Sequence, residues 1–451
     1  MSELRKLAKF ISELKIDNVP EQVQNTAKLH VLDSVGAALG ASNDQLLKNI
    51  ANTYYNLAGE SQAVCCWGQK RKVPLLTGVF LNAMMGHILE LDDVHTNSKT
   101  HIGTVVVPTA WTLSEYLGVS GKEFLEAVIC GYETMSRIGM GFGVSSHRNK
   151  GWHVTATAGT FGAAAAAAKL LKLDEEKTLY ALGMAGTQSF GLWAFLADGA
   201  NCKILHPARA AANGTEAAFL AKSGMTGPEH ILDAKDGGLF AAMSDEYDLS
   251  LVSKDLGEKY ELMYVDNKPY PCCRSTHCAI DAAMAVRNEY GLTNDDIRSI
   301  EVATYLVGYK QCGVSQGSKN PTKPVEAKFS TPYTVACAVT FGEVTLNQFK
   351  QENIEKKSVR DLLKKVTVVP DDKYTNVYPN HWGCEIRVTC KDGRRFKKEI
   401  VDASGSVHNP LTQEQVKSKA ISLIKNTCSD DASHIAETIL DIDNMQIIPE
   451  L

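Results

Sequence analysis

Residues 86–103 form a short stretch whose side chains suit proton chemistry. It contains three carboxylates and three histidines: Glu90, Asp92, Asp93, His87, His95 and His101. The preceding run, residues 74–89, is apolar and helical in character, and charge begins abruptly at Glu90. Carboxylates and imidazoles at the mouth of a buried helix lose hydration, which shifts their pKa values and suits general acid–base chemistry. The structural alternative is a capping cluster whose side chains are solvated.

Two loops further along the chain each place a histidine near the start of a predicted helix. His153 precedes an alanine-rich helix that we expect over residues 156–171. The positive end of a helix depresses the pKa of an imidazole and favours bound anions. Lys203 and His206 lie in the glycine-containing segment 198–207, where Lys203 could hold a carboxylate or carry a proton. The structural alternatives are a capping or core histidine and a surface lysine.

The second half of the chain adds two candidate segments. Two prolines in residues 268–271 predict an extended approach, after which Arg274 and His277 lie one helical turn apart and can face the same site. Arginine suits a bidentate grip on a carboxylate. Tyr333 could donate a proton, although such a tyrosine is more often a core residue with a satisfied hydroxyl.

Composition excludes several classes of protein. The 451 residues are 44% hydrophobic, enough for a large core, and the net charge of -5 without a basic stripe or tail argues against a nucleic-acid partner. The N-terminus is amphipathic and the apolar runs are too short to span a bilayer, so we expect a soluble, cytoplasmic protein. The twelve cysteines form no Cys-x-x-Cys motif, and no glycine-rich nucleotide loop or Gly-x-Ser-x-Gly elbow occurs.

The hydrophobic pattern divides the chain into two regions. A helical pattern dominates residues 1–265, and the tail, residues 405–451, returns to it. Between them, residues 266–404 mix helices with strands, which suggests a separate α+β domain. The predicted strands are 297–305, 366–369, 384–390 and 395–401, the last two joined by an Asp-Gly turn. The expected fold class is mainly α: a large all-helical domain plus a smaller α+β domain.

Taken together and in this order, these segments resemble the MmgE/PrpD family, which includes 2-methylcitrate dehydratase, cis-aconitate decarboxylase and iminodisuccinate epimerase. The resemblance covers nearly the whole chain. It implies a helical domain built from both chain ends, an inserted α+β lid domain, an active site between them, a homodimer, and no metal or organic cofactor. By position, the family's catalytic histidines, lysine and tyrosine match His101, His153, Lys203, His277 and Tyr333.

The acidic motif departs from the family pattern at two points. Family members commonly read Asp-Phe-Asp-Asp-Thr where this chain reads Glu-Leu-Asp-Asp-Val over residues 90–94. The loop that leads to His101 is also longer than in the decarboxylase branch. Both departures weigh against cis-aconitate decarboxylation, and they leave open which of Glu90, Asp92 and Asp93 faces the site.

We therefore expect a cofactor-independent lyase or isomerase that acts on a small di- or tricarboxylate by proton transfer next to a carboxylate. A dehydratase or decarboxylase leads, and an epimerase of a substituted succinate comes second. Two further hypotheses are a metal-dependent hydrolase that uses the carboxylates and histidines of residues 90–101, and a non-catalytic polycarboxylate-binding protein. The candidate catalytic residues are Asp93, His101, His153, Lys203, His277 and Tyr333, and the candidate substrate-binding residues are Glu90, Asp92, His206 and Arg274.

Overall fold

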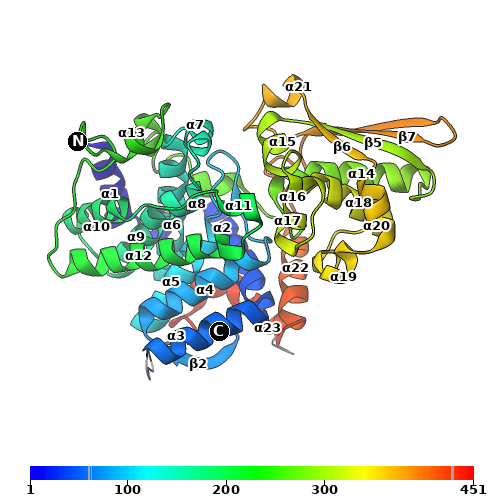
Figure 1. The fold of residues 1–451 in the computed structure, drawn as a ribbon. Coiled ribbons are helices and arrows are strands. Elements are labelled where there is room, and N and C mark those ends of the chain that lie inside the picture. The colour runs from blue at the N-terminus through cyan, green and yellow to red at the C-terminus, as the bar shows by residue number, and fades with distance from the viewer. Residues whose placement is uncertain (59–60, 62, 428–430) are drawn as a thin grey trace.

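The computed structural model describes residues 1–58, 61, 63–427 and 431–451. In Figure 1, a large helical body that carries both chain ends lies beside a smaller body with a four-stranded sheet. The structure thus confirms the predicted fold class. We keep the predicted division as a definition: the helical domain is residues 1–265 with 405–451, and the lid domain is residues 266–404.

The helical domain is built mainly from long helices, with one small hairpin, β1 (Val64–Cys66) and β2 (Gln69–Val73). None of the described helices is both long and apolar enough to cross a membrane. The helices are α1 (Glu3–Glu13), α2 (Glu21–Gly40), α3 (Gln45–Ala58), α4 (Leu75–Ile88), α5 (Gly103–Leu117), α6 (Gly121–Gly141), α7 (Val144–Asn149), α8 (Val154–Thr157), α9 (Gly159–Leu170), α10 (Glu175–Thr187), α11 (Phe195–Asp198), α12 (Leu205–Lys222), α13 (Leu239–Met243), α22 (Gln413–Lys425) and α23 (Ala432–Leu440).

Helix α9 lies at the centre of this domain because its small side chains let its neighbours approach closely. Its alanines 163–168 are fully buried, and it packs against α5, α6, α10 and α12. A Cβ added at Gly214 of α12 would lie 2.3 Å from the carbonyl oxygen of Thr160. The single helix predicted over residues 156–171 is instead α8 followed by α9. The interruption is local, because Ala158 between them keeps right-handed helical angles (φ -86°, ψ -22°).

The C-terminal segment returns to the first half of the chain. Helix α22 packs along α2, and a Cβ at Gly36 would lie only 2.8 Å from the Cα of Ala420. One hydrophobic core accordingly combines side chains of residues 4–265 with side chains of residues 420–448. The chain therefore leaves the helical domain for the lid domain and returns to the same core.

The lid domain is organised by a mixed sheet with the strand order β6-β5-β7-β8. Strand β5 runs parallel to β6 and antiparallel to β7, and β7 and β8 form a hairpin. All four predicted strands are confirmed: β5 (Ile297–Thr304), β6 (Val366–Pro370), β7 (Cys384–Cys390) and β8 (Arg395–Ile400). Residues on β7 alternate between buried and more exposed, as expected for a sheet covered on one face.

Helices cover that face and complete the second core, which draws on residues 272–403. Helix α14 packs against α18, β7 and β8, and α18 packs against α20 and β6. The lid helices are α14 (His277–Tyr290), α15 (Leu306–Cys312), α16 (Gln316–Lys319), α17 (Pro324–Lys328), α18 (Thr331–Phe341), α19 (Gln351–Ile354), α20 (Lys357–Leu363) and α21 (Asp372–Thr375).

Candidate active site between the two domains

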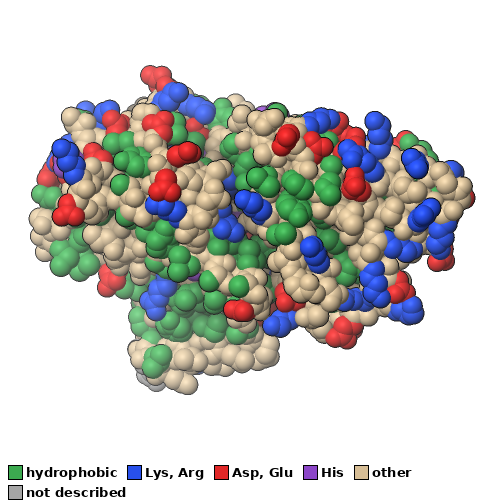
Figure 2. Space-filling view, turned by 45° about the horizontal axis from the view of Figure 1, so that its top comes forward, with side chains coloured by type: hydrophobic (Ala, Val, Ile, Leu, Met, Phe, Trp, Pro, Cys, Tyr) green, Lys and Arg blue, Asp and Glu red, His purple; other side chains and the backbone are tan. Residues whose placement is uncertain are grey.

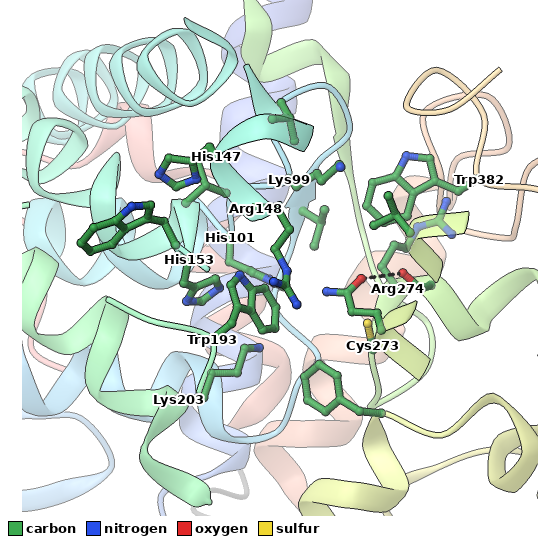
Figure 3. A pocket seen from close by; sticks show the side chains of 18 of the residues that line it. Lys99, His101, His147, Arg148, His153, Trp193, Lys203, Cys273, Arg274 and Trp382 are labelled. Carbon is green, nitrogen blue, oxygen red and sulfur yellow. Dashed lines mark hydrogen bonds between the residues drawn. The ribbon is translucent and has the colours of Figure 1, made fainter. Parts of the chain in front are cut away.

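A cavity lies where the helical domain meets the lid domain (Figure 3). Its empty space, including the mouth open to solvent, is about 620 Å³. The helical domain supplies the loop after α4, helix α7 and the segments around residues 153 and 203, and the lid domain supplies residues 273–275 and part of α15. The polar lining residues are Glu90, Lys99, His101, His147, Arg148, His153, Lys203, Cys273, Arg274, Ser275 and Gln311.

A two-residue ladder fixes the acidic stretch against the entrance to the lid domain. Strand β3 (Val94–His95) pairs antiparallel with β4 (Val265–Asp266), so that Val94 lies opposite Asp266. The sequence did not predict this ladder, because two residues are too few to show a period. It ties the loop that carries the site to the segment that carries Lys268 and Arg274.

Asp92 lies beneath two of the histidines. Its Oδ2 is 2.7 Å from Nδ1 of His87 and 3.0 Å from Nδ1 of His101, and all three side chains are largely or fully buried. Nδ1 of His101 also lies 2.9 Å from the carbonyl oxygen of Asp93. Two acceptors at Nδ1 mean that this nitrogen carries the proton, which leaves Nε2 of His101 as the basic atom.

The electrostatics of this group favour a neutral His101 beside an ionised Asp92. Burial lowers the pKa of His101 to about 3, although the Asp92 carboxylate acts in the opposite direction. Burial raises the pKa of Asp92, but His87, His101 and Lys268 together outweigh burial and hold it well below its usual range. His101 is therefore an uncharged base near pH 7, oriented by a carboxylate.

The Asp93 side chain accepts hydrogen bonds from a different set of residues. Its Oδ1 accepts the backbone N–H of Gly103 at 2.8 Å, and its Oδ2 accepts the Tyr132 hydroxyl at 2.7 Å. Burial raises the pKa of Asp93 to about 7. Asp92 therefore contacts His101 through its carboxylate, whereas Asp93 contacts His101 only through its backbone carbonyl.

Glu90 joins two lysines at the floor of the cavity. Its Oε1 lies 2.5 Å from Nζ of Lys203, and its Oε2 lies 3.5 Å from Nζ of the fully buried Lys268. Lys268 also lies 3.8 Å from Asp92. Glu90 has a left-handed backbone (φ 58°), which costs about 1 kcal/mol or more in a non-glycine residue. Burial raises its pKa, but Lys203, Lys268 and His87 together outweigh burial and hold the pKa well below its usual range, so Glu90 is ionised.

His153 and His206 form a second pair of imidazoles. Their Nδ1 atoms are 2.8 Å apart, so one donates a hydrogen bond and the other accepts it. Burial lowers the pKa of His206 to about 4 and holds the pKa of His153 well below its usual range, and Lys203 adds to both shifts. His153 lines the cavity and packs edge-on against Trp193, whereas His206 stands behind it.

The lid domain brings Arg274 to the cavity but not the other two predicted lid residues. Nε of Arg274 donates to Oδ2 of Asp266 at 2.8 Å. His277 and Tyr333 are fully buried and do not line the cavity. Nε2 of His277 is 3.3 Å from the Cys272 carbonyl, and the Tyr333 hydroxyl donates to the Gln348 carbonyl, as in a core tyrosine with a satisfied hydroxyl.

With this geometry in view, the comparisons with known proteins decide the family. The model of the MmgE/PrpD N-terminal domain matches residues 5–252, and that of the MmgE/PrpD C-terminal domain matches residues 270–444. The chain belongs to the MmgE/PrpD family.

Cis-aconitate decarboxylases are among the relatives of this MmgE/PrpD protein. The Homo sapiens cis-aconitate decarboxylase is 30% identical over 426 residues, which span 91% of this chain and 85% of the relative. The Mus musculus cis-aconitate decarboxylase is 28% identical, over 98% of this chain and 92% of the relative. The Aspergillus terreus cis-aconitate decarboxylase is 26% identical, over 98% of this chain and 93% of the relative.

Three basic residues of this MmgE/PrpD site were not identified from sequence. In the sequence Lys268 is only the start of a stiff segment, although it contacts both Glu90 and Asp92. Lys99 and Arg148 line the cavity. The one sequence feature that points to Lys99 and Arg148 is their nearness to predicted site residues. Lys99 lies within residues 86–103, and Arg148 lies shortly before His153.

A metal ion fits this group poorly. His87, Asp92 and His101 could offer three ligand atoms within 4.8 Å of one another. However, the ammonium of Lys268 lies 3.8 Å from Asp92, and one oxygen of Asp92 already faces both imidazoles. A divalent cation there would face a buried positive charge. The donor set therefore suits an oriented base better than a metal centre.

Proposed function

We propose that this MmgE/PrpD protein is a cofactor-independent lyase that acts on a small di- or tricarboxylate, with decarboxylation as the leading reaction. The observation that carries the proposal is the charge of the cavity wall. Four cations and one carboxylate line it: Lys99, Arg148, Lys203, Arg274 and Glu90. Figure 2 shows basic side chains beside the hollow between the two domains. An excess of buried positive charge favours an anionic substrate.

The neutral bases lie at the same cavity as the cations. His101, His153 and Lys203 all line it, and Nζ of Lys203 lies 5.3 Å from the ring centroid of the lid residue Phe329. A carboxylate bound near Lys203 would thus have an imidazole beside the carbon that carries it. Lys203 would stabilise the enolate-like charge that develops on that carboxylate.

Decarboxylation then requires only charge stabilisation and one proton. The bond to the departing carboxylate breaks, carbon dioxide leaves without the electron pair, and a neighbouring carboxylate takes up the charge. The developing charge raises the proton affinity of the adjacent imidazole, so that His101 or His153 can pass a proton from solvent to the carbon. Asp92 would hold His101 in orientation and stabilise its transient cation.

The relatives support decarboxylation as the first candidate reaction. The three described above are all named cis-aconitate decarboxylase, at 26–30% identity. The neutral Nε2 of His101 also suits removal of a carbon-bound proton, which is the first step of dehydration or epimerisation. Dehydration of a hydroxylated tricarboxylate is therefore the second candidate.

Proton NMR in deuterated buffer tests the proposal. The panel is cis-aconitate, 2-methylcitrate, citrate, and substituted malates and succinates. We expect product formation or deuterium uptake from one compound, and a loss of about a hundredfold or more in kcat for His101→Ala and Lys203→Ala. His230→Asn, a change at an exposed histidine, is the matched control.

Each result would separate the lyase from the competing functions. Full turnover by both alanine variants would overturn the assignment of these residues. Saturable binding of a polycarboxylate with no turnover of any compound would favour a binding protein. Stoichiometric metal in active protein would favour the metal-dependent hydrolase.

A further inference from the structure

The four cations of the cavity wall fall into two kinds. Lys203 is paired with Glu90, and Arg274 with Asp266, so an internal carboxylate already balances each of them. Lys99 and Arg148 have no ion pair with any carboxylate in the described part of the chain. The uncompensated positive charge of the cavity is therefore concentrated at two residues.

Lys99 is held in the cavity by a strained turn. Its backbone is left-handed (φ 60°), and its N–H donates to the His95 carbonyl at 2.8 Å. The turn is closed by Ser98, whose hydroxyl contacts both His95 and Thr100. The left-handed conformation costs about 1 kcal/mol or more in a non-glycine residue. The contacts around the turn must therefore offset this strain.

The ammonium of Lys99 is buried and lacks a hydrogen-bond acceptor among the described residues. It faces the ring of Tyr378, with Nζ 4.1 Å from the ring centroid. Burial lowers the pKa of Lys99 to about 7, and the charge of Arg148 contributes to this shift. A buried amine without an acceptor is unfavourable, and a bound anion would relieve the cost.

Arg148 presents a second such cation. It lies on α7, and its guanidinium carbon stands 4.4 Å from the centroid of the Trp193 ring. Within the described residues its guanidinium has no hydrogen-bonded acceptor, and burial lowers its pKa. Stacking on Trp193 fixes the plane of the guanidinium and leaves its N–H groups for an anion. Figure 3 shows Arg148 reaching into the cavity between Lys99 and Lys203 in this view.

We propose that Lys99 and Arg148 form a subsite for a second carboxylate of the substrate, one that does not react. This inference rests on the proposed function, because it assumes that the reacting carboxylate binds near Lys203 and His101. The aromatic rings of Tyr378 and Trp193 carry no charge to compete with that carboxylate. The subsite would select substrates with at least two carboxylates and fix their orientation toward His101.

The test compares two ligands that differ by one carboxylate, the dicarboxylate glutarate and the monocarboxylate butyrate. Calorimetric titrations of the full chain are made below pH 7, where Lys99 is charged. Wild-type protein should bind glutarate about tenfold or more tighter than butyrate. Lys99→Met and Arg148→Met should each lose most of that preference, and Lys99→Arg should keep it. Met at position 99 keeps an unbranched side chain of similar length, and Lys235→Met, at an exposed lysine, is the matched control.

The outcomes separate this inference from the proposed function. If wild-type protein prefers glutarate to butyrate and both methionine variants keep the full preference, the subsite is refuted while the proposed function stands. If wild-type protein binds neither ligand and turns over no polycarboxylate, both are refuted. Loss of the preference in folded variants whose thermal midpoint matches that of the control supports the subsite.

Discussion

Asp92 and His101 are 3.0 Å apart, between Oδ2 and Nδ1, and the same Asp92 oxygen lies 2.7 Å from His87. One carboxylate oxygen thus orients two imidazoles, and it does so beneath the cavity rather than inside it. Asp92 is a positioning residue in this arrangement, because its contacts reach the substrate only through His101.

Asp92→Asn should lower kcat by about a hundredfold or more while changing KM little, because the amide favours the wrong tautomer of His101. Asp93→Asn is the matched change one residue away. It should leave kcat within about tenfold, since the Asp93 side chain binds Gly103 and Tyr132 instead. Steady-state kinetics on the substrate found by NMR would check both variants, and equal losses would contradict the distinction between the two aspartates.

Asp93 should make stability depend on pH. Burial raises its pKa from 3.8 to about 7, so the folded protein binds more protons than the unfolded chain between these values. Its favourable contribution is complete below pH 3.8 and is lost as pH rises through about 7. Calorimetry should therefore show that the thermal midpoint of wild type falls relative to that of Asp93→Asn as pH rises from about 5 to about 8. A constant difference would show that Asp93 titrates normally.

Glu90→Gln should increase the affinity of the cavity for anions. The substitution keeps the shape of the side chain but removes the carboxylate that balances Lys203. We expect tricarballylate to bind about tenfold tighter, with a lower kcat if Glu90 also positions Lys203. Titration calorimetry would measure the change, with the exposed Glu216→Gln as the control. Weaker binding would mean that Glu90 itself holds the ligand.

Cys273 should react with alkylating agents faster than the cysteines around it. It lines the cavity, and a hydrogen bond with Cys312 lowers its pKa to about 7 although burial opposes this, whereas burial raises the pKa of Cys272 to about 12. Iodoacetamide should inactivate the proposed lyase at a rate that increases as pH rises through about 7, and tricarballylate should protect it. Because Cys202 is exposed and would also be alkylated, the experiment uses protein in which Cys202 has been replaced by serine. Mass spectrometry that finds Cys273 unlabelled in inactivated protein would refute the prediction.

The sequence by itself determined the two-domain helical architecture and most of the strands. Long amphipathic and alanine-rich runs can form little but packed helices, and alternating runs with an Asp-Gly turn specify a hairpin. It also identified His101, His153, Lys203 and Arg274, all of which line the cavity. These residues stand beside strong local signals, such as a helix start or a stiff proline segment.

Only the tertiary structure decided which neighbouring side chains reach the site. Asp92 and Asp93 are adjacent and chemically alike, yet they serve different partners because side-chain direction in a loop depends on the backbone angles of single residues. Glu90 has a left-handed backbone, and its carboxylate pairs with Lys203 and Lys268, which are distant in sequence. The β3–β4 ladder likewise joins residues 94–95 to residues 265–266. The spacing of hydrophobic residues in a sequence indicates which face of a helix is buried, but no such spacing indicates where a loop turns. For that reason the helices could be predicted, whereas the places of Lys99 and Arg148 in the cavity could not.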